Sequence, residues 1–123
     1  MILELTKIHP KPGITVLHMK GSIHTGPDCR RVEHETEAFV KANELFVIFD
    51  LSQVTHIDSA AIGSIVRSFM HLKTSGGALR LAGCKGMIEA SLKLTKLHKI
   101  LDLYPTATDA AENFPPPISQ NIE

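Results

Sequence analysis

The chain is organised around LFVIFDLSQVTHIDSAAIG, residues 45–63. Its first part, Leu45–Leu51, is apolar over the length of one strand, and this pattern is typical of a strand covered on both faces. We therefore expect this strand at the centre of the sheet. Apolar residues then recur at helical spacing over Ser59–Ser75, and Gly76-Gly77 end that run. The stretch predicts a central strand, a connecting loop and a helix, in that order.

The flanking segments continue an alternation of strands and helices. Ile2–Ile8 and Ile14–Met19 alternate apolar and polar residues around a Pro/Gly turn, so they predict an antiparallel hairpin that Gly21 closes. The other expected elements are a helix over Pro27–Asn43 capped by Gly26 or Thr25, a strand over Ala78–Ala82, a helix over Lys85–Lys96, a strand over Ile100–Tyr104 and a helix opened by Thr106 and ending at Phe114. This order predicts an α/β fold with a mixed, mainly parallel sheet of four to five strands, an antiparallel edge hairpin and about four helices.

Composition narrows the class of protein. The 123 residues suit one domain, which we place at residues 1–114, followed by a flexible, Pro-rich tail at 115–123. Lys plus Arg and Asp plus Glu are both 13, so we expect no basic face for nucleic acid. No apolar run reaches the roughly 18 residues that span a bilayer, and the first residues lack the pattern of a signal peptide. We expect a cytoplasmic protein without a membrane span.

Cysteines and histidines do not predict a metal or cofactor. Cys29 and Cys84 are too few for a disulfide scaffold or a zinc site, and we expect both thiols to be reduced and largely buried. No two histidines are three or four residues apart, as a metal pair on one helix requires. Solvent exposure is expected for His18, His34 and His71, and turns or helix ends for His9 and His98.

Ser59 stands immediately before the first helical apolar residues, where it would act as the N-cap of the helix. The N-terminus of a helix also stabilises a phosphate group, because its free N–H groups and its dipole favour negative charge. Val54 and Ile57 are expected to hold the preceding loop against the core. The small residues around Gly63 would then let a partner approach Ser59 closely.

The run FDLSQVTHIDSAAIG, residues 49–63, resembles the D-L-S-x-V-x-x-I-D-S-[SA]-[GA]-[LI]-G signature of the STAS domain, the family of sulfate transporters and anti-sigma factor antagonists. Further matches follow in order at Gly76-Gly77, Leu92–Leu97, Leu103–Thr106 and Asp109–Ala111, so the resemblance covers Ile2 to Phe114. It implies the STAS fold and places the phosphorylated serine at Ser59. It also implies that the unphosphorylated domain binds an anti-sigma factor serine kinase and frees a sigma factor. Phosphorylation then releases the kinase, and a serine phosphatase would reverse the reaction.

The partner-binding surface expected around Ser59 comprises Asp58, Ser59, Ala60, Ile62, Gly63, His24, Thr25, His56 and Arg67. His24 and His56 are expected to lie near Ser59 and to respond to pH or contact the kinase. The sequence departs from the family in the preceding loop. The family often has G-E-[LI]-D followed by T-A-P-E-L, whereas this chain has GSIH at 21–24 and TGPDC at 25–29. Both acidic residues of G-E-[LI]-D are therefore absent from this chain. Lys96 stands where the family often has glycine.

Two other functions fit parts of the sequence. A STAS domain can serve as a scaffold or as a regulator of a transport complex, with Ser59 acting only as a helix cap. A serine hydrolase would use Ser59 as nucleophile, His24 or His56 as base and Asp58 or Asp50 to orient the base. The chain has no G-x-S-x-G turn to present such a nucleophile, so we expect a regulator and not an enzyme.

Overall fold

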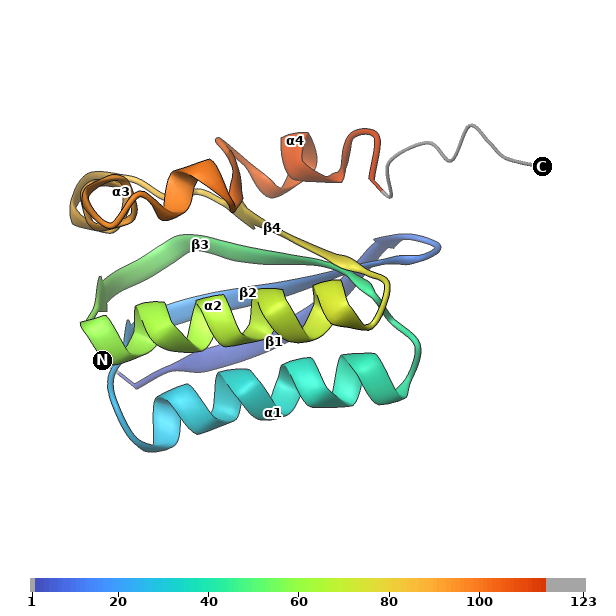
Figure 1. The fold of residues 1–123 in the computed structure, drawn as a ribbon, viewed down its shortest axis with the longest axis horizontal. Coiled ribbons are helices and arrows are strands. Elements are labelled where there is room, and N and C mark those ends of the chain that lie inside the picture. The colour runs from blue at the N-terminus through green and yellow to red at the C-terminus, as the bar shows by residue number, and fades with distance from the viewer. Residues whose placement is uncertain (1, 115–123) are drawn as a thin grey trace.

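The computed structural model describes residues 2–114 as a five-stranded sheet with helices on both faces (Figure 1). The elements are β1 (Glu4–Lys11), β2 (Ile14–Ile23), α1 (Pro27–Lys41), β3 (Phe46–Ile57), α2 (Ser59–Thr74), β4 (Ala78–Ala82), α3 (Gly86–Leu94), the 3-10 turn η1 (Leu97–Lys99), β5 (Asp102–Tyr104) and α4 (Ala107–Ala111). The predicted tail at 115–123 lies outside the described residues.

The strands lie in the order β1-β2-β3-β4-β5, so β3 occupies the centre of the sheet as predicted. β1 and β2 form the antiparallel edge hairpin, and every other neighbouring pair is parallel. Phe46 of β3 is paired with Ile14 of β2 on one side and with Ala78 of β4 on the other. The predicted mixed α/β architecture, with its edge hairpin and four helices, is confirmed.

The two faces of β3 belong to two different cores. Val47, Phe49 and Leu51 point toward α1 and α2, which run side by side on one face of the sheet (Figure 1). Ile48 belongs to a smaller core on the other face, formed largely by β2 and α4. Successive side chains of a strand point to opposite faces, so a strand buried on both sides must be apolar at nearly every position. This explains the continuous apolar run at the start of β3.

β3 does not end at Leu51, and the prediction of a loop between this strand and the next helix is wrong. β4 ends at Ala82, which is paired with Asp50, whereas β2 continues to Ile23 and is paired with β3 as far as Ile57. Within residues 2–114 the second half of β3 is thus paired with β2 alone, and Leu51 and Val54 are its buried residues. Gly21 does not close the hairpin either. It lies within β2, where a Cβ atom would collide with the Ile2 carbonyl.

Arg80 fixes the C-terminal helix to the sheet. It is only 8% exposed, and its guanidinium donates hydrogen bonds to the carbonyls of Ala110 (2.9 Å), Glu112 (3.0 Å) and Asn113 (3.4 Å). The guanidinium carbon also lies 4.2 Å from the ring centre of Phe114. Because these carbonyls bond Arg80, the chain leaves the helix after Ala111, with Asn113 in the left-handed region. The predicted continuation of this helix to Phe114 is therefore wrong.

The predicted N-caps of α1 and α4 are confirmed. Thr106 caps α4 by accepting a hydrogen bond from the Asp109 N–H at 3.0 Å, as expected, and Gly26 is the N-cap of α1. At Lys96, where the family often has glycine, φ is 62°, which is the left-handed conformation.

The predicted burial of the cysteines can be compared with the structure, in which Cys29 is buried and Cys84 is half-buried. His18 is not solvent-facing, because it is half-buried on β2 and its Nδ1 lies 3.0 Å from Asp50 Oδ2. His9 lies in β1 and not in a turn.

Replacing glycine by alanine should have opposite effects on stability at Gly77 and at Gly63. A Cβ on Gly77 would overlap the Leu45 carbonyl, so Gly77→Ala should lower the free energy of unfolding by about 3 kcal/mol. A Cβ on Gly63 would meet only the flexible Arg67 side chain at 3.4 Å, so Gly63→Ala should raise that free energy by about 0.5–1 kcal/mol, because alanine favours a helix. Urea unfolding of both variants checks this, and equal effects would contradict the packing described for Gly77.

Candidate functional site

Ser59 is the first residue of α2 and its side chain is exposed at the carboxyl end of β3. It is not the helix cap. Asp58 is the N-cap, and its Oδ1 accepts a hydrogen bond from the Ala61 N–H at 2.9 Å. Within residues 2–114, the Ser59 hydroxyl makes no hydrogen bond to another side chain. The sequence signal for this arrangement was present, because aspartate is as good an N-cap as serine.

Asp58 also connects two loops. Its second oxygen, Oδ2, accepts a hydrogen bond from the Thr25 N–H at 2.9 Å, so one carboxylate binds both the start of α2 and the loop between β2 and α1. The bond from the Ala61 N–H, followed by that from Thr25, lowers the pKa of Asp58 below its ordinary value of 3.8. The residue before Ser59 is therefore a fixed negative charge at neutral pH.

His24 and His56 lie together at the end of the sheet from which α2 begins. Their ring centroids are 5.2 Å apart with the ring planes tilted by 37°. The backbone of His24 is held at both polar atoms, because its N–H donates to Asp28 Oδ2 at 3.0 Å and its carbonyl accepts from the Cys29 thiol at 3.2 Å. Both histidines are exposed, so they flank the N-terminus of α2 without belonging to the core.

The remaining predicted site residues divide into two groups. Ala60, Ile62 and Gly63 are half-buried in the first turns of α2, close in sequence to Ser59. Arg67 turns instead toward α1, where its Nη2 lies 2.8 Å from Glu33 Oε2. The structure therefore does not bring Arg67 to the Ser59 hydroxyl.

Glu33 was not predicted as a site residue. Its Oε2 also accepts a hydrogen bond from the buried Ser64 hydroxyl at 2.6 Å, so Glu33 joins α1 to α2. The hydrogen bond from Arg67 lowers the pKa of Glu33 below its ordinary value. In the sequence Glu33 is one of several charged residues on the outer face of α1, and nothing there indicates which of them faces α2.

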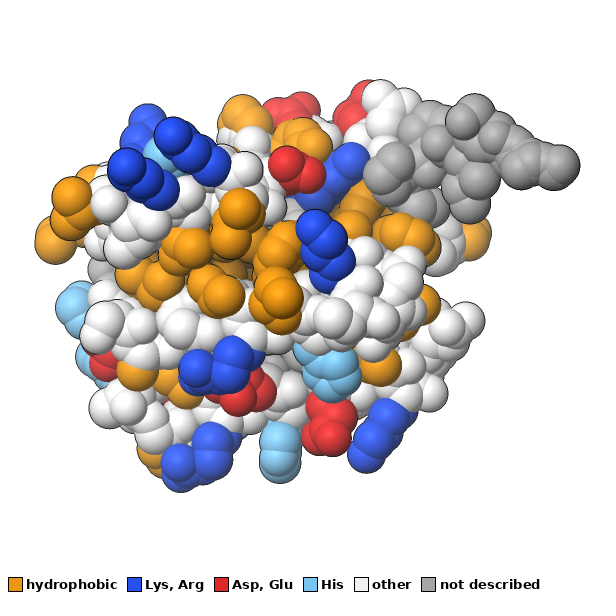
Figure 2. Space-filling model, in the orientation of Figure 1, with side chains coloured by type: hydrophobic (Ala, Val, Ile, Leu, Met, Phe, Trp, Pro, Cys, Tyr) orange, Lys and Arg blue, Asp and Glu red, His pale blue; other side chains and the backbone are white. Residues whose placement is uncertain are grey.

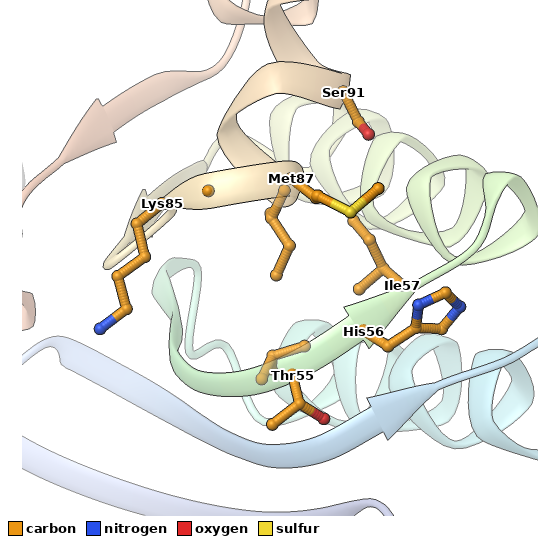
Figure 3. A pocket seen from close by; sticks show the side chains of 9 residues that line it. Thr55, His56, Ile57, Lys85, Met87 and Ser91 are labelled. Atoms are coloured by element: carbon orange, nitrogen blue, oxygen red, sulfur yellow. The ribbon is translucent and has the colours of Figure 1, made fainter.

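A cavity of about 250 Å³ lies between the second half of β3 and the start of α3. Figure 3 shows its lining, with His56 and Ile57 from β3 and Lys85, Met87 and Ser91 on the other side. No group of three or more His, Cys, Asp or Glu side chains that could hold a metal ion occurs among residues 2–114. The residues of the hydrolase hypothesis are not joined as a triad within residues 2–114, since the Asp58 oxygens accept from backbone N–H groups and the Asp50 oxygens contact His18 and the Ser52 N–H.

Apolar side chains also gather on the surface near α2 and α3 (Figure 2). Met70 of α2 and Met87 and Leu94 of α3 are large hydrophobic residues with exposed side chains. Exposed apolar side chains are common on proteins, but several together favour contact with another protein.

A family model, the STAS domain, matches residues 6–110 of the chain. The chain belongs to the STAS domain family. The resemblance seen in the residues around Ser59 is thereby confirmed. This STAS domain is also 36% identical over 70 residues to a Thermotoga maritima protein named "Putative anti-sigma factor antagonist". The match covers 57% of the chain and 60% of that relative, so the chain spans about three fifths of the relative's length.

Solved structures share the fold of this STAS domain. The crystal structure of a Thermotoga maritima protein with the same description has a TM-score of 0.79 at 22% identity, covering 90% of this chain and 92% of the other. The Bacillus protein SpoIIAA in its phosphorylated form has a TM-score of 0.72 at 11% identity, covering 89% and 98%. Unphosphorylated SpoIIAA, an anti-sigma factor antagonist, has a TM-score of 0.71 at 10% identity, covering 93% and 100%.

None of the helices within residues 2–114 of the STAS domain combines the length and the apolar character needed to cross a membrane.

Removing the Asp58 carboxylate should destabilise the STAS domain, because this carboxylate joins the loop after β2 to the start of α2. Asp58→Ala leaves the Thr25 and Ala61 N–H groups without their acceptor, so it should lower the free energy of unfolding by about 1 kcal/mol at pH 7. Asp58→Asn keeps a side-chain oxygen and should lose less. Urea unfolding measures both effects.

The Asp58 effect should depend on pH in one direction. The pKa of Asp58 is lower in the folded than in the unfolded chain, so its stabilisation is present at neutral pH and is lost as the pH falls below 3.8 through the lowered pKa. The difference between the native chain and Asp58→Ala should therefore shrink in acid. A difference that stayed constant down to the acid transition would show that the charge of Asp58 is not involved.

Proposed function

We propose that this STAS domain is an anti-sigma factor antagonist that works as a phosphorylation switch at Ser59. In the unphosphorylated state it binds an anti-sigma factor that is also a serine kinase, and the sigma factor is freed. The kinase transfers a phosphoryl group from ATP to the Ser59 oxygen, and the phosphorylated domain dissociates. A serine phosphatase restores the binding form.

The observation that carries this proposal is the division of tasks between Asp58 and Ser59. Asp58 caps α2, so the Ser59 hydroxyl is exposed and is not required for the fold. A phosphate can be added to Ser59 without breaking a hydrogen bond that holds the helix. The sequence around Ser59 matches the family signature, and SpoIIAA is known in phosphorylated and unphosphorylated forms.

The charge added at this position explains how binding would be lost. A phosphoserine carries about 1.5 to 2 negative charges at neutral pH, and here it would stand next to the ionised Asp58. The helix dipole offsets this by only about 0.3–1 kcal/mol, so the domain should remain folded. In a complex, the phosphate would lose its water against a surface that fits a neutral serine. A cost of about 4 kcal/mol there is roughly a thousandfold in affinity.

The proposed partner surface has small and apolar residues at its centre and polar residues around them. Ala60 and Gly63 keep the first turns of α2 low, and Ile62 adds a half-buried apolar side chain. Thr25, His24 and His56 form the margin beyond Asp58. Arg67 lies farther along α2, paired with Glu33, and would contact the partner only at the edge of this surface. With equal numbers of acidic and basic residues, the domain offers little long-range attraction, so surface shape should dominate recognition.

We further propose that the domain acts by binding and not by catalysis, and that it needs no cofactor. The regulator hypothesis requires an exposed serine on a stable helix end, and that is present. The hydrolase hypothesis requires a base on Ser59, and no hydrogen bond joins Ser59 to His24 or His56 among residues 2–114.

The first test is phosphorylation of the purified chain. Incubation with its cognate anti-sigma factor kinase and ATP should add one phosphate, found on Ser59 by mass spectrometry. Ser59→Ala should accept none and should unfold at the same urea concentration as the native chain, because Asp58 provides the cap. Ser75→Ala changes the other end of α2 and should leave phosphorylation unchanged. Phosphate on another residue, with none on Ser59, would contradict the assignment.

The second test separates charge from shape. Ser59→Asp should bind the kinase at least about tenfold more weakly than the native chain, because a carboxylate replaces the hydroxyl next to Asp58. Ser59→Asn has nearly the same size without the charge and should retain most of the affinity. Calorimetry or surface plasmon resonance with the same kinase measures both. Equal weakening by the two variants would mean that size and not charge controls release.

A further inference from the structure

We propose that His24 and His56 together bind one divalent transition-metal ion of the zinc or nickel class. This site is separate from the phosphorylation of Ser59 and does not depend on the proposed switch. It uses two exposed imidazoles at the margin of the proposed partner surface. Imidazole nitrogens are good ligands for zinc, nickel and copper.

The separation of the rings fits a shared metal ion. The His24 and His56 ring centroids are 5.2 Å apart and the planes are tilted by 37°, so the rings are neither stacked in parallel nor at right angles. A tetrahedral ion about 2.05 Å from one nitrogen of each ring would hold the two ring centres about 5.2 Å apart. The separation of the ring centres therefore matches that of two imidazoles that share one ion.

The backbone under both rings is fixed. His56 is paired with Ser22 in the sheet, and His24 follows directly after β2. The His24 N–H is bonded to Asp28, and the neighbouring Thr25 N–H is bonded to Asp58. These two carboxylates also place negative charge near the pair, which favours a cation. Because His56 is paired in the sheet and the His24 N–H is hydrogen-bonded, little order would have to be created when the ion binds.

Other possible ligands in the described part of the chain are less suitable. His9 and His18 each lie 3.0 Å from a carboxylate, Glu44 and Asp50 respectively, whereas His24 and His56 lie beside each other. Burial, followed by the charges of Glu89 and Asp50, raises the pKa of the Cys84 thiol to about 12, so it is not a thiolate at neutral pH. The Cys29 thiol is buried and donates to the His24 carbonyl.

Two histidines leave two positions of a tetrahedral ion for water. Both rings are exposed at the end of the sheet from which α2 begins, so these positions would be open to solvent or to a side chain of a bound protein. A site with two protein ligands should bind zinc more weakly than the four-ligand sites that stabilise small folds.

The test is titration of the metal-free, full-length chain with zinc chloride and with nickel chloride, followed by calorimetry and by NMR of the histidine ring nitrogens. One ion should bind, and the signals of His24 and His56 should shift together. His24→Gln and His56→Gln should each lower the affinity roughly tenfold or more. His9→Gln and His71→Gln are matched controls and should leave the affinity unchanged. Thermal unfolding of all four variants should show that each remains folded.

Two results would overturn the proposal. One is the absence of binding at millimolar zinc or nickel, and the other is binding that neither His24→Gln nor His56→Gln weakens. Ser59→Ala should retain metal binding, so failure of the metal site and failure of the phosphorylation switch can be told apart.

Discussion

Burial of β3 on both faces is the constraint on which the rest of the domain depends. Val47 and Phe49 on one side and Ile48 on the other are fully buried, so neither face of this strand can meet water. β2 and β4 must therefore pair with both edges, and helices must cover both faces. On the first face α1 and α2 supply long apolar stripes, whereas among residues 2–114 the second face is covered by the short α4, which Arg80 fixes in place.

The same strand determines where the candidate site lies. Beyond Asp50 it has no pairing with β4, and it continues beside β2 to Ile57. This extension carries Asp58 past the end of β4, next to the loop that follows β2. The Asp58 carboxylate then binds N–H groups of Thr25 and Ala61 and joins the two segments. Ser59, His24 and His56 are held at one end of the sheet as a consequence.

Several features of the fold could be predicted because they arise from local patterns. The apolar run at 45–51 indicated the central strand, and alternation at 14–19 indicated the hairpin. The predictions that are wrong concern places where a residue distant in the sequence contacts the segment. β3 is longer than its apolar run because β2 pairs with it, and α4 is shorter than its pattern because Arg80 bonds the carbonyls of Ala110 in its last turn and of Glu112 just beyond it. His18 is half-buried beside Asp50 because adjacent strands bring the two residues together.

The sequence by itself determined the order of the elements, the family and the position of Ser59 at the start of α2, because strand and helix periodicity and a contiguous signature are local properties. Only the tertiary structure decided that Asp58 also accepts a hydrogen bond from Thr25, that Arg67 pairs with Glu33, and that the ring centres of His24 and His56 lie 5.2 Å apart. Each of these depends on which segments lie side by side. Contacts between residues more than thirty positions apart follow from sheet register and helix packing, and no local pattern specifies them.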